Sequence, residues 1–148
     1  MVQMRRNAFG RLRRFFRWLL QQQGNPGEKA RGLAIGIFCG CFPLFGFQTL
    51  MGIVLARLLR GNYLLAASGT WISNPITYVP LYLLNYRVGS FALGHRHIVQ
   101  SFVDFSWRGI VSNGWIFAVR LLLGSTLVGT ICGLALGLCI YFALKARS

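Results

Sequence analysis

Residues 33–50 read LAIGIFCGCFPLFGFQTL, and residues 69–77 read GTWISNPIT. Each stretch belongs to a long apolar segment that a proline interrupts near its middle, Pro43 in the first and Pro75 in the second. Proline lacks a backbone N–H and clashes with the preceding helical turn, so both segments are predicted to break there. Broken backbone at membrane depth is tolerated only where it is buried in protein or lines a cavity. We therefore expect a site at the two breaks, and not an anchor alone.

The composition is typical of a membrane protein. Of the 148 residues, 55% are hydrophobic and only 12% are charged, against roughly 25% charged residues in a soluble domain. Charged residues are absent from residues 32–56, 61–86 and 121–144. Each of these stretches exceeds the roughly 20 residues that span a hydrocarbon core. We expect an all-α integral membrane protein.

The charge is strongly unbalanced, with a formal net charge of +14. Sixteen Lys and Arg residues face only two acidic residues, Glu28 and Asp104, and 8 of the 16 precede the first apolar stretch. Anionic lipid headgroups are the expected counter-charge. Nucleic acid is not an expected partner, because the chain lacks a soluble basic binding face.

Residues 1–27 are predicted to form a basic amphipathic helix followed by a linker. On a helical projection, aromatic and leucine side chains occupy one face and arginines the other, so the helix is expected to lie on the membrane. A presequence is an alternative reading, because the segment is rich in Arg and free of acid. A solvated tail is another, although the aromatic face argues against it. The arginines expected to bind anionic lipid are Arg11, Arg13, Arg14 and Arg17.

The membrane domain, residues 28–148, is predicted to begin with two broken segments, residues 32–60 and 61–93. The two arms around Pro43 have 11 and 13 residues, so each rises only about 16 to 20 Å at 1.5 Å per residue. Neither arm spans a membrane alone. The arms either cross collinearly with a kink or fold back as a re-entrant hairpin, and the second segment repeats this plan around Pro75.

Cations favour the hairpins. With the N-terminus in the cytoplasm, two hairpins and one crossing leave fewer Lys and Arg residues outside than three crossings do. We therefore expect two re-entrant segments. A mixed arrangement, with one crossing and one hairpin, would instead return the C-terminus to the cytoplasm.

The last part of the chain is divided into an interfacial segment, residues 94–119, and a transmembrane helix, residues 120–144. The first is more polar, and a transmembrane placement would bury Asp104 and Arg108. On the second, small residues recur at every fourth position, which lets another helix approach closely. They are Ser125, Gly129, Gly133 and Gly137. The partner helix is either the chain's own or that of a second copy in a homo-oligomer.

Catalysis and metal binding find little support in the sequence. One Glu, one Asp and two His residues assemble neither paired carboxylates nor a Ser-His-Asp set, so we expect no catalytic residue, no metal and no cofactor. All four cysteines lie in apolar stretches and are expected to be reduced packing residues. They are Cys39, Cys41, Cys132 and Cys139.

The two breaks are predicted to bind an anion. If Ser73 or Asn74 caps a helix that begins at Pro75, free N–H groups and a partial positive charge point into the protein interior. Such a helix start suits phosphate or carboxylate. The alternative is that these polar side chains only satisfy the backbone freed by the prolines. The predicted ligand-binding residues are Pro43, Gly46, Gln48, Thr49, Ser73, Asn74, Pro75 and Thr77.

Four motifs resemble a bacterial membrane family called domain of unknown function 2062. They are AIGIF at 34–38, PLFGFQT at 43–49, LLRGN at 58–62 and GTWISNPIT at 69–77, of which the last is the most specific. The likeness covers residues 29–144 and implies a small bacterial inner-membrane protein, sometimes joined to glycosyltransferases that use polyprenyl-phosphate sugars. It implies no established activity. The chain departs from the pattern at Cys39 and Cys41, where Gly, Ile or Leu is expected.

Two classes of function follow for a multi-pass inner-membrane protein with a cytoplasmic N-terminus. The first is a carrier or flippase-like protein for a phosphate-bearing lipid or other amphipathic anion, with the breaks as its site. The second is a non-catalytic scaffold that binds anionic lipid and recruits a partner such as a glycosyltransferase. The breaks favour the carrier, since an anchor has no need of them. The small size favours the scaffold, because a carrier of this size would have to dimerise to enclose a pathway.

Overall fold

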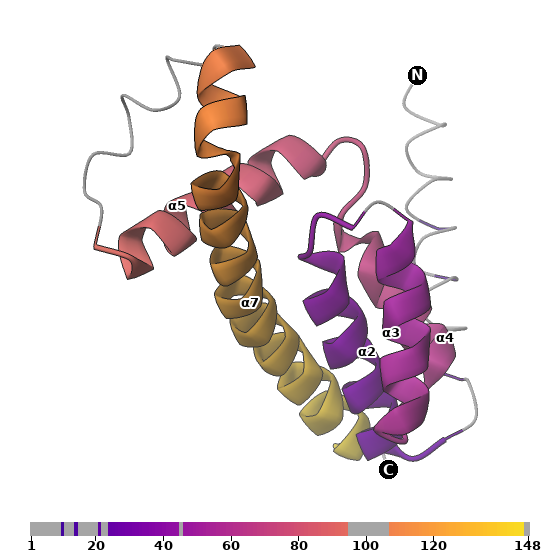
Figure 1. Cartoon of the computed structure of the whole chain (residues 1–148). Coiled ribbons are helices and arrows are strands. Elements are labelled where there is room, and N and C mark those ends of the chain that lie inside the picture. Colours follow the sequence, from indigo (N-terminus) through magenta and orange to yellow (C-terminus); the bar gives the residue numbers. More distant parts are fainter. Residues whose placement is uncertain are drawn as a thin grey trace.

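The computed structural model describes residues 10, 14, 21, 24–44, 46–94 and 107–146, with side chains of the last range described from residue 114 onward. As predicted, the regular elements in these ranges are helices, and no strand occurs there. The predicted N-terminal amphipathic helix lies almost wholly outside the described residues. The helices are α2 (Pro26–Gly40), α3 (Phe47–Leu58), α4 (Tyr63–Gly69), the short 3-10 helix η1 (Thr70–Ile72), α5 (Tyr78–Ala92) and α7 (Trp107–Lys145) (Figure 1).

The first broken segment folds back on itself. Helix α2 begins with Pro26 in its first turn, where the missing N–H of proline costs nothing. It ends at Gly40, and Pro43 follows in the turn that leads to α3. Gly46 precedes α3 with a φ of 82°, a left-handed conformation that glycine adopts readily. Helices α2 and α3 then pack side by side (Figure 1).

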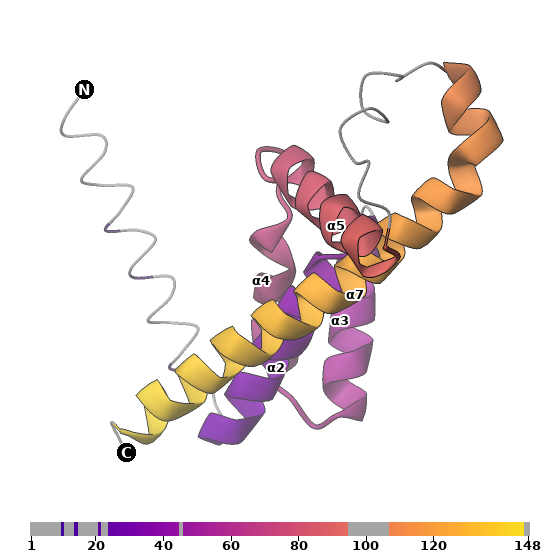
Figure 2. The same cartoon turned by 90° about the vertical axis from the view of Figure 1, so that its left-hand side faces the viewer.

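The second segment does not repeat this plan. Helix α4 packs against α2 and α3, and Asn62 caps it by accepting hydrogen bonds from Leu64 N (3.0 Å) and Leu65 N (3.1 Å). After η1 the chain turns away, and α5 packs against α7 instead of lying along α4 (Figure 2). The two arms of this segment therefore belong to different parts of the molecule.

Glycine faces allow the helices to come together. Gly32 and Gly36 of α2 lie one turn apart, and a Cβ at either would overlap a carbonyl oxygen of the α4 region, that of Asn62 or of Ala66. The crossing of α5 and α7 is equally close. A Cβ at Gly124 would overlap the carbonyl oxygen of Asn85. Backbones can approach in this way only where side chains are absent.

Helix α7 starts earlier than expected. Residues 107–119 were predicted to belong to a separate interfacial segment, but they are continuous with the long helix. The reason lies at Arg120, the predicted boundary. Its Nη1 donates to the Tyr86 hydroxyl (3.0 Å), and its guanidinium carbon lies 5.9 Å from the centre of that ring. Helix α5 thus provides a hydrogen-bond partner for the charge of Arg120, which lies within α7.

Part of α7, Gly114–Lys145, is long and apolar enough to cross a membrane, with a mean hydropathy of 2.2 in its most apolar stretch. Its last turn lies beside the first turn of α2, because Tyr141 and Gly27 line one cavity. The start of α4 is tied to the same place by the hydrogen bond from Asn62 N to Glu28 O (2.9 Å). The start of α2, the start of α4 and the end of α7 therefore lie on the same side of the molecule.

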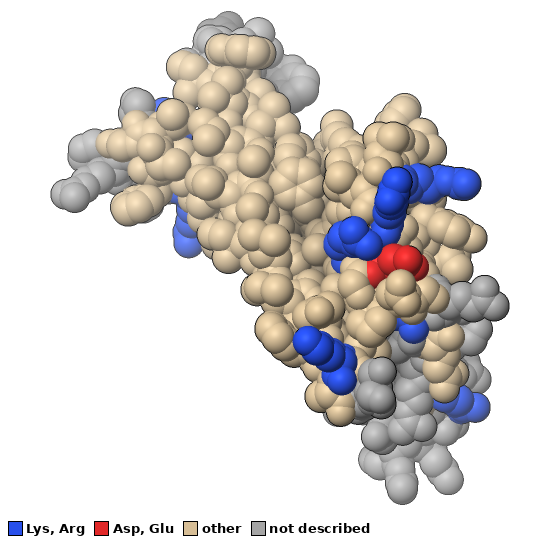
Figure 3. Space-filling view, turned by 90° about the horizontal axis from the view of Figure 1, so that it is seen from below, with Lys and Arg blue, Asp and Glu red and all other residues tan. Residues whose placement is uncertain are grey.

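This side, which we call the cationic end, gathers basic residues from α2, from the last turn of α3 and the chain after it, and from the end of α7. Figure 3 views the molecule from below and shows several Lys and Arg side chains around a single acidic group. The residues of the cationic end are Glu28, Lys29, Arg31, Arg57, Arg60 and Lys145.

The substitution Gly124→Ala tests the crossing of α5 and α7. We expect it to lower the free energy of unfolding by roughly 1–3 kcal/mol, as overpacking does, because the new Cβ overlaps the Asn85 carbonyl. Gly114→Ala is the matched control on the same helix, since no described residue lies within 4 Å of a Cβ there. Unfolding in detergent by titration with a denaturing surfactant measures both. Equal stability of the two variants would contradict the close crossing.

Candidate functional site

Polar side chains from the two breaks meet in the structure. Gln48 Nε2, in the first turn of α3, donates to Ser73 Oγ (2.8 Å). One residue further on, Thr49 Oγ1 lies 3.0 Å from Thr70 Oγ1. We call Gln48, Thr49, Thr70 and Ser73 the polar junction. It joins the start of α3 to the end of η1, two places more than 20 residues apart in the sequence.

Three residues of the polar junction are buried, and Thr49 is half-buried. Gln48 and Ser73 are each 5% exposed and Thr70 is 1% exposed. Ser73 Oγ also donates to Thr70 O (3.1 Å), so its hydroxyl proton is used within the junction. Gln48 Oε1 is buried and has no hydrogen-bond partner within the described part of the chain, a state that it shares with Asn85 Oδ1, Ser90 Oγ and Arg120 Nε. An unpaired buried amide oxygen costs free energy, and it marks the junction as a place where a further polar group would be stabilised.

Asn74 and Thr77 form a turn ahead of α5. Asn74 Oδ1 accepts hydrogen bonds from Ile76 N (3.0 Å) and Thr77 N (3.1 Å), and Thr77 Oγ1 donates to Ile72 O (2.7 Å). The predicted helix start at Pro75 is wrong by three residues, because this turn holds the chain until α5 begins at Tyr78. The side chains therefore satisfy local backbone groups, which is the alternative role that the sequence left open.

The remaining predicted residues lie around the junction. Pro43 is half-buried in the turn after α2, and Pro75 is exposed. Gly46 is exposed at the start of α3, and no described side chain caps that helix. A Cβ at Gly46 would meet nothing within 4 Å among the described residues. The uncapped start of α3 thus faces open space next to Gln48.

Asn85 is the residue that the sequence analysis missed. It is fully buried on α5, and its Nδ2 donates both to Cys41 O (2.8 Å), just beyond the end of α2, and to Ser125 Oγ (3.0 Å) on α7. One side chain therefore bonds α2, α5 and α7 together. An amide in the middle of an apolar arm is the signal that could have found it, since intramembrane polar residues pair with other helices.

The small residues of α7 lie against the chain's own α2. A Cβ at Gly133 would come within 2.7 Å of Ala34 O, and one at Gly137 within 2.9 Å of Ala34 Cβ. Gly129 faces Phe38 and Cys41, and Ser125 bonds Asn85. The structure thus places all four on the packed side of α7. Of the four cysteines, which are all free, Cys39 and Cys41 are buried, Cys132 is half-buried and Cys139 is exposed.

Of the four arginines predicted to bind anionic lipid, the structure describes Arg14. It is exposed, and its Nε donates to Gly10 O (3.3 Å). Arg11, Arg13 and Arg17 lie outside the described residues. His95, His97 and Asp104 do so too. Among the residues that are described, no group of three His, Cys, Asp or Glu side chains could hold a metal ion.

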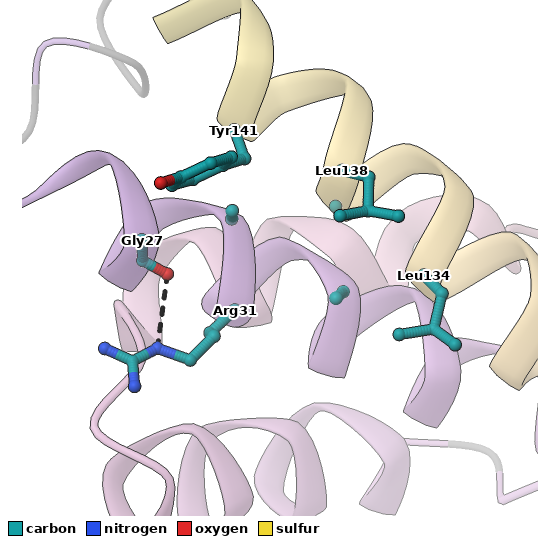
Figure 4. A pocket seen from close by; sticks show the side chains of 8 residues that line it. Gly27, Arg31, Leu134, Leu138 and Tyr141 are labelled. Carbon is teal, nitrogen blue, oxygen red and sulfur yellow. Dashed lines mark hydrogen bonds between the residues drawn. The ribbon is translucent and has the colours of Figure 1, made fainter. Parts of the chain in front are cut away.

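A groove lies between the start of α2 and the end of α7, at the opposite end of α2 from the polar junction. It has a volume of about 320 Å³. Figure 4 shows Arg31 and the Tyr141 hydroxyl at one end of this groove, with Leu138 and Leu134 further along α7. We call it the α2–α7 groove. Its lining residues are Gly27, Ala30, Arg31, Ala34, Leu134, Gly137, Leu138 and Tyr141.

Fold and site together define an all-helical protein with one helix suited to crossing a membrane and a buried polar junction between broken segments. The model of the family described as "Uncharacterized protein conserved in bacteria (DUF2062)" matches residues 10–148, and the chain belongs to this family. No curated protein and no solved structure matched the chain.

A double-mutant cycle tests the bond between Asn85 and Ser125. Asn85→Ala and Ser125→Ala are expected to couple by roughly 0.6–1.7 kcal/mol, from the average to the maximum measured for hydrogen bonds between membrane helices in double-mutant cycles. Thr126→Ala is the matched control, because the Thr126 hydroxyl is exposed and bonds its own helix at Leu122 O. Free energies of unfolding in detergent give the coupling. A coupling near zero between Asn85→Ala and Ser125→Ala would contradict the hydrogen bond between these residues. An equal coupling between Asn85→Ala and Thr126→Ala would contradict it too.

Proposed function

We propose that this chain is a non-catalytic, multi-pass protein of the bacterial inner membrane that acts as a carrier or flippase-like protein for a phosphate-bearing lipid or similar amphipathic anion. The single observation that carries the proposal is the polar junction. Its side chains come from both breaks, are buried among apolar helices, and include an unpaired amide oxygen.

Exposed apolar surface supports insertion in a membrane. Only 22% of the most apolar stretch of α7 is buried, whereas the core helix of a soluble protein is mostly buried. Helix α3 also exposes large apolar side chains at positions three to four residues apart: Phe47, Leu50, Val54 and Leu58. Surface of this kind is stable in contact with lipid or another protein, not with water.

The cationic end supports an orientation. Lys and Arg residues near membrane helices favour the cytoplasmic side, and the cationic end carries five of them and one carboxylate. Helices α2 and α3 would then enter from the cytoplasm and return as a re-entrant hairpin. Helix α4 and the chain up to α5 would cross the membrane, and α7 would cross it again and return the C-terminus to the cytoplasm. This is the mixed arrangement that the sequence left open.

The chemistry of the polar junction supports an anionic ligand with hydroxyl groups. Gln48 Nε2 uses one N–H on Ser73, so the second N–H is left for an acceptor. The start of α3 has no side-chain cap among the described residues, and a helix start carries a partial positive charge; the Gln48 N–H itself donates to Leu44 O (3.0 Å). Gln48 Oε1 is suited to a hydroxyl donor such as a protonated phosphate oxygen or a headgroup alcohol.

The scaffold is the second candidate. Its recruiting face would be the small-residue ladder of α7, but the three glycines of the ladder pack against α2 and the residue after it, and Ser125 bonds Asn85 of α5. The ladder is therefore not free to bind a partner helix in this arrangement. The apolar face of α3 remains as the surface on which a scaffold could hold another membrane protein.

Translocation of a fluorescent polyprenyl phosphate in proteoliposomes tests the carrier. We expect transport by the native protein and its loss in Gln48→Leu, because leucine keeps the apolar volume but has no donor for Ser73 or the ligand. Thr130→Val is the control, since its hydroxyl bonds Thr126 O of its own helix, away from the junction. Absence of transport by the folded native protein, or full transport by Gln48→Leu, would contradict the proposal.

A reporter fused after Ser148 tests the orientation. The end of α7 lies beside the start of α2 at the cationic end, so we expect a green fluorescent protein fused there to fluoresce. An alkaline phosphatase at the same position should be inactive, because it folds only outside the cytoplasm. Active phosphatase would contradict the proposed arrangement.

A further inference from the structure

The α2–α7 groove is an elongated slot with an apolar floor. Along both helices its lining spans seven residue steps, from Gly27 to Ala34 and from Leu134 to Tyr141. This corresponds to about 10 Å at 1.5 Å per residue. Its volume of about 320 Å³ lies at the lower end of the range of ligand pockets, roughly 300–1,000 Å³. Leu134 and Leu138 are 59% and 55% exposed, so the slot opens to the surroundings of the helix pair.

Only one end of the groove is polar. Arg31 Nε donates to Gly27 O (3.2 Å), which holds the exposed guanidinium beside the first turn of α2 and leaves its two terminal nitrogens for another acceptor; Figure 4 shows it on the other side of this turn from Tyr141. Lys145 Nζ lies 5.9 Å from the centre of the Tyr141 ring, which itself lines the groove. Each of the two helices therefore carries a cation near this end of the groove, Arg31 beside Gly27 and Lys145 beside Tyr141.

We propose that the α2–α7 groove binds one acyl chain of an anionic glycerophospholipid, with the lipid phosphate at Arg31 and Lys145. The apolar slot matches the chain, and the cations match the phosphate. A guanidinium binds phosphate with two parallel hydrogen bonds. Basic pockets between membrane helices on the cytoplasmic side favour anionic headgroups for the same reason.

This lipid site differs from the polar junction in place and in role. The groove lies at the start of α2, and the junction lies beyond its end. A lipid held between α2 and α7 adds contact to the pair of helices whose backbones approach at Gly133 and Gly137. Lipid binding in the groove does not require transport. A negative translocation assay would therefore leave the lipid site in place, and absence of lipid from the groove would leave the carrier proposal in place.

Photo-crosslinking tests the groove. The native protein is placed in nanodiscs with phosphatidylglycerol that carries a diazirine on one acyl chain, and labelled peptides are mapped by mass spectrometry. We expect labelling concentrated at residues 134–141 and 27–34. Unlabelled phosphatidylglycerol should compete, and phosphatidylcholine should not. Gln48→Leu should label as the native protein does, which separates this result from that of the translocation assay.

Matched variants sharpen the test. Arg31→Gln is expected to reduce labelling about fivefold, the effect of one cation near the membrane surface, while Arg87→Gln on exposed α5 surface should leave it unchanged. Leu138→Trp should fill the groove and abolish labelling there. Leu136→Trp is its control, since Leu136 is 45% exposed and does not line the groove. Labelling that follows exposed apolar surface in general, or equal competition by phosphatidylcholine, would overturn the proposal.

Discussion

The hydrogen bond from Asn85 Nδ2 to the carbonyl oxygen of Cys41 is the interaction on which the arrangement of the helices depends. The carbonyl groups at the end of α2 have no partners within the helix, and apolar surroundings provide no water to replace them. Asn85 supplies the missing donor from α5, and the same amide nitrogen bonds Ser125 of α7. The chain can therefore leave α2 at Pro43 without burying an unpaired carbonyl at Cys41, which allows the break and the polar junction next to it.

Close backbone contact is the second condition. Gly124 lets α7 approach the Asn85 backbone, and Gly36 lets α4 approach α2 in the same manner. Helices in lipid associate through such packing and through polar bonds between them, since lipid tails compete with apolar side chains. The polar junction and the α2–α7 groove are products of this packing. The first forms where helices end, and the second where α2 and α7 leave a slot between their outer side chains.

Local sequence predicted the features that depend on local chemistry. The break at Pro43 follows from the missing N–H of proline, and the packed side of α7 follows from its four-residue repeat of small residues. The direction of α5 could not be predicted, because it depends on contact with α7 across a long stretch of chain. The start of α7 was predicted too late, since the tyrosine that pairs with Arg120 lies on another helix. Gly32 and Gly36 are spaced four residues apart, as the small residues of α7 are, and they too mark a helix contact. Their partner, α4, is seen only in the structure.

The proposed site exists only if the two proline breaks meet, as they do at Thr49 and Thr70. Disulfide formation between Thr49→Cys and Thr70→Cys, in a protein whose four native cysteines are replaced by alanine, tests it most directly. The two hydroxyl oxygens lie 3.0 Å apart, and a disulfide requires Cβ atoms within about 4.5 Å. We expect rapid oxidation in native membranes, read as loss of maleimide labelling, and none when Thr126→Cys replaces Thr70→Cys. Thiols that stay fully labelled at positions 49 and 70 would contradict it.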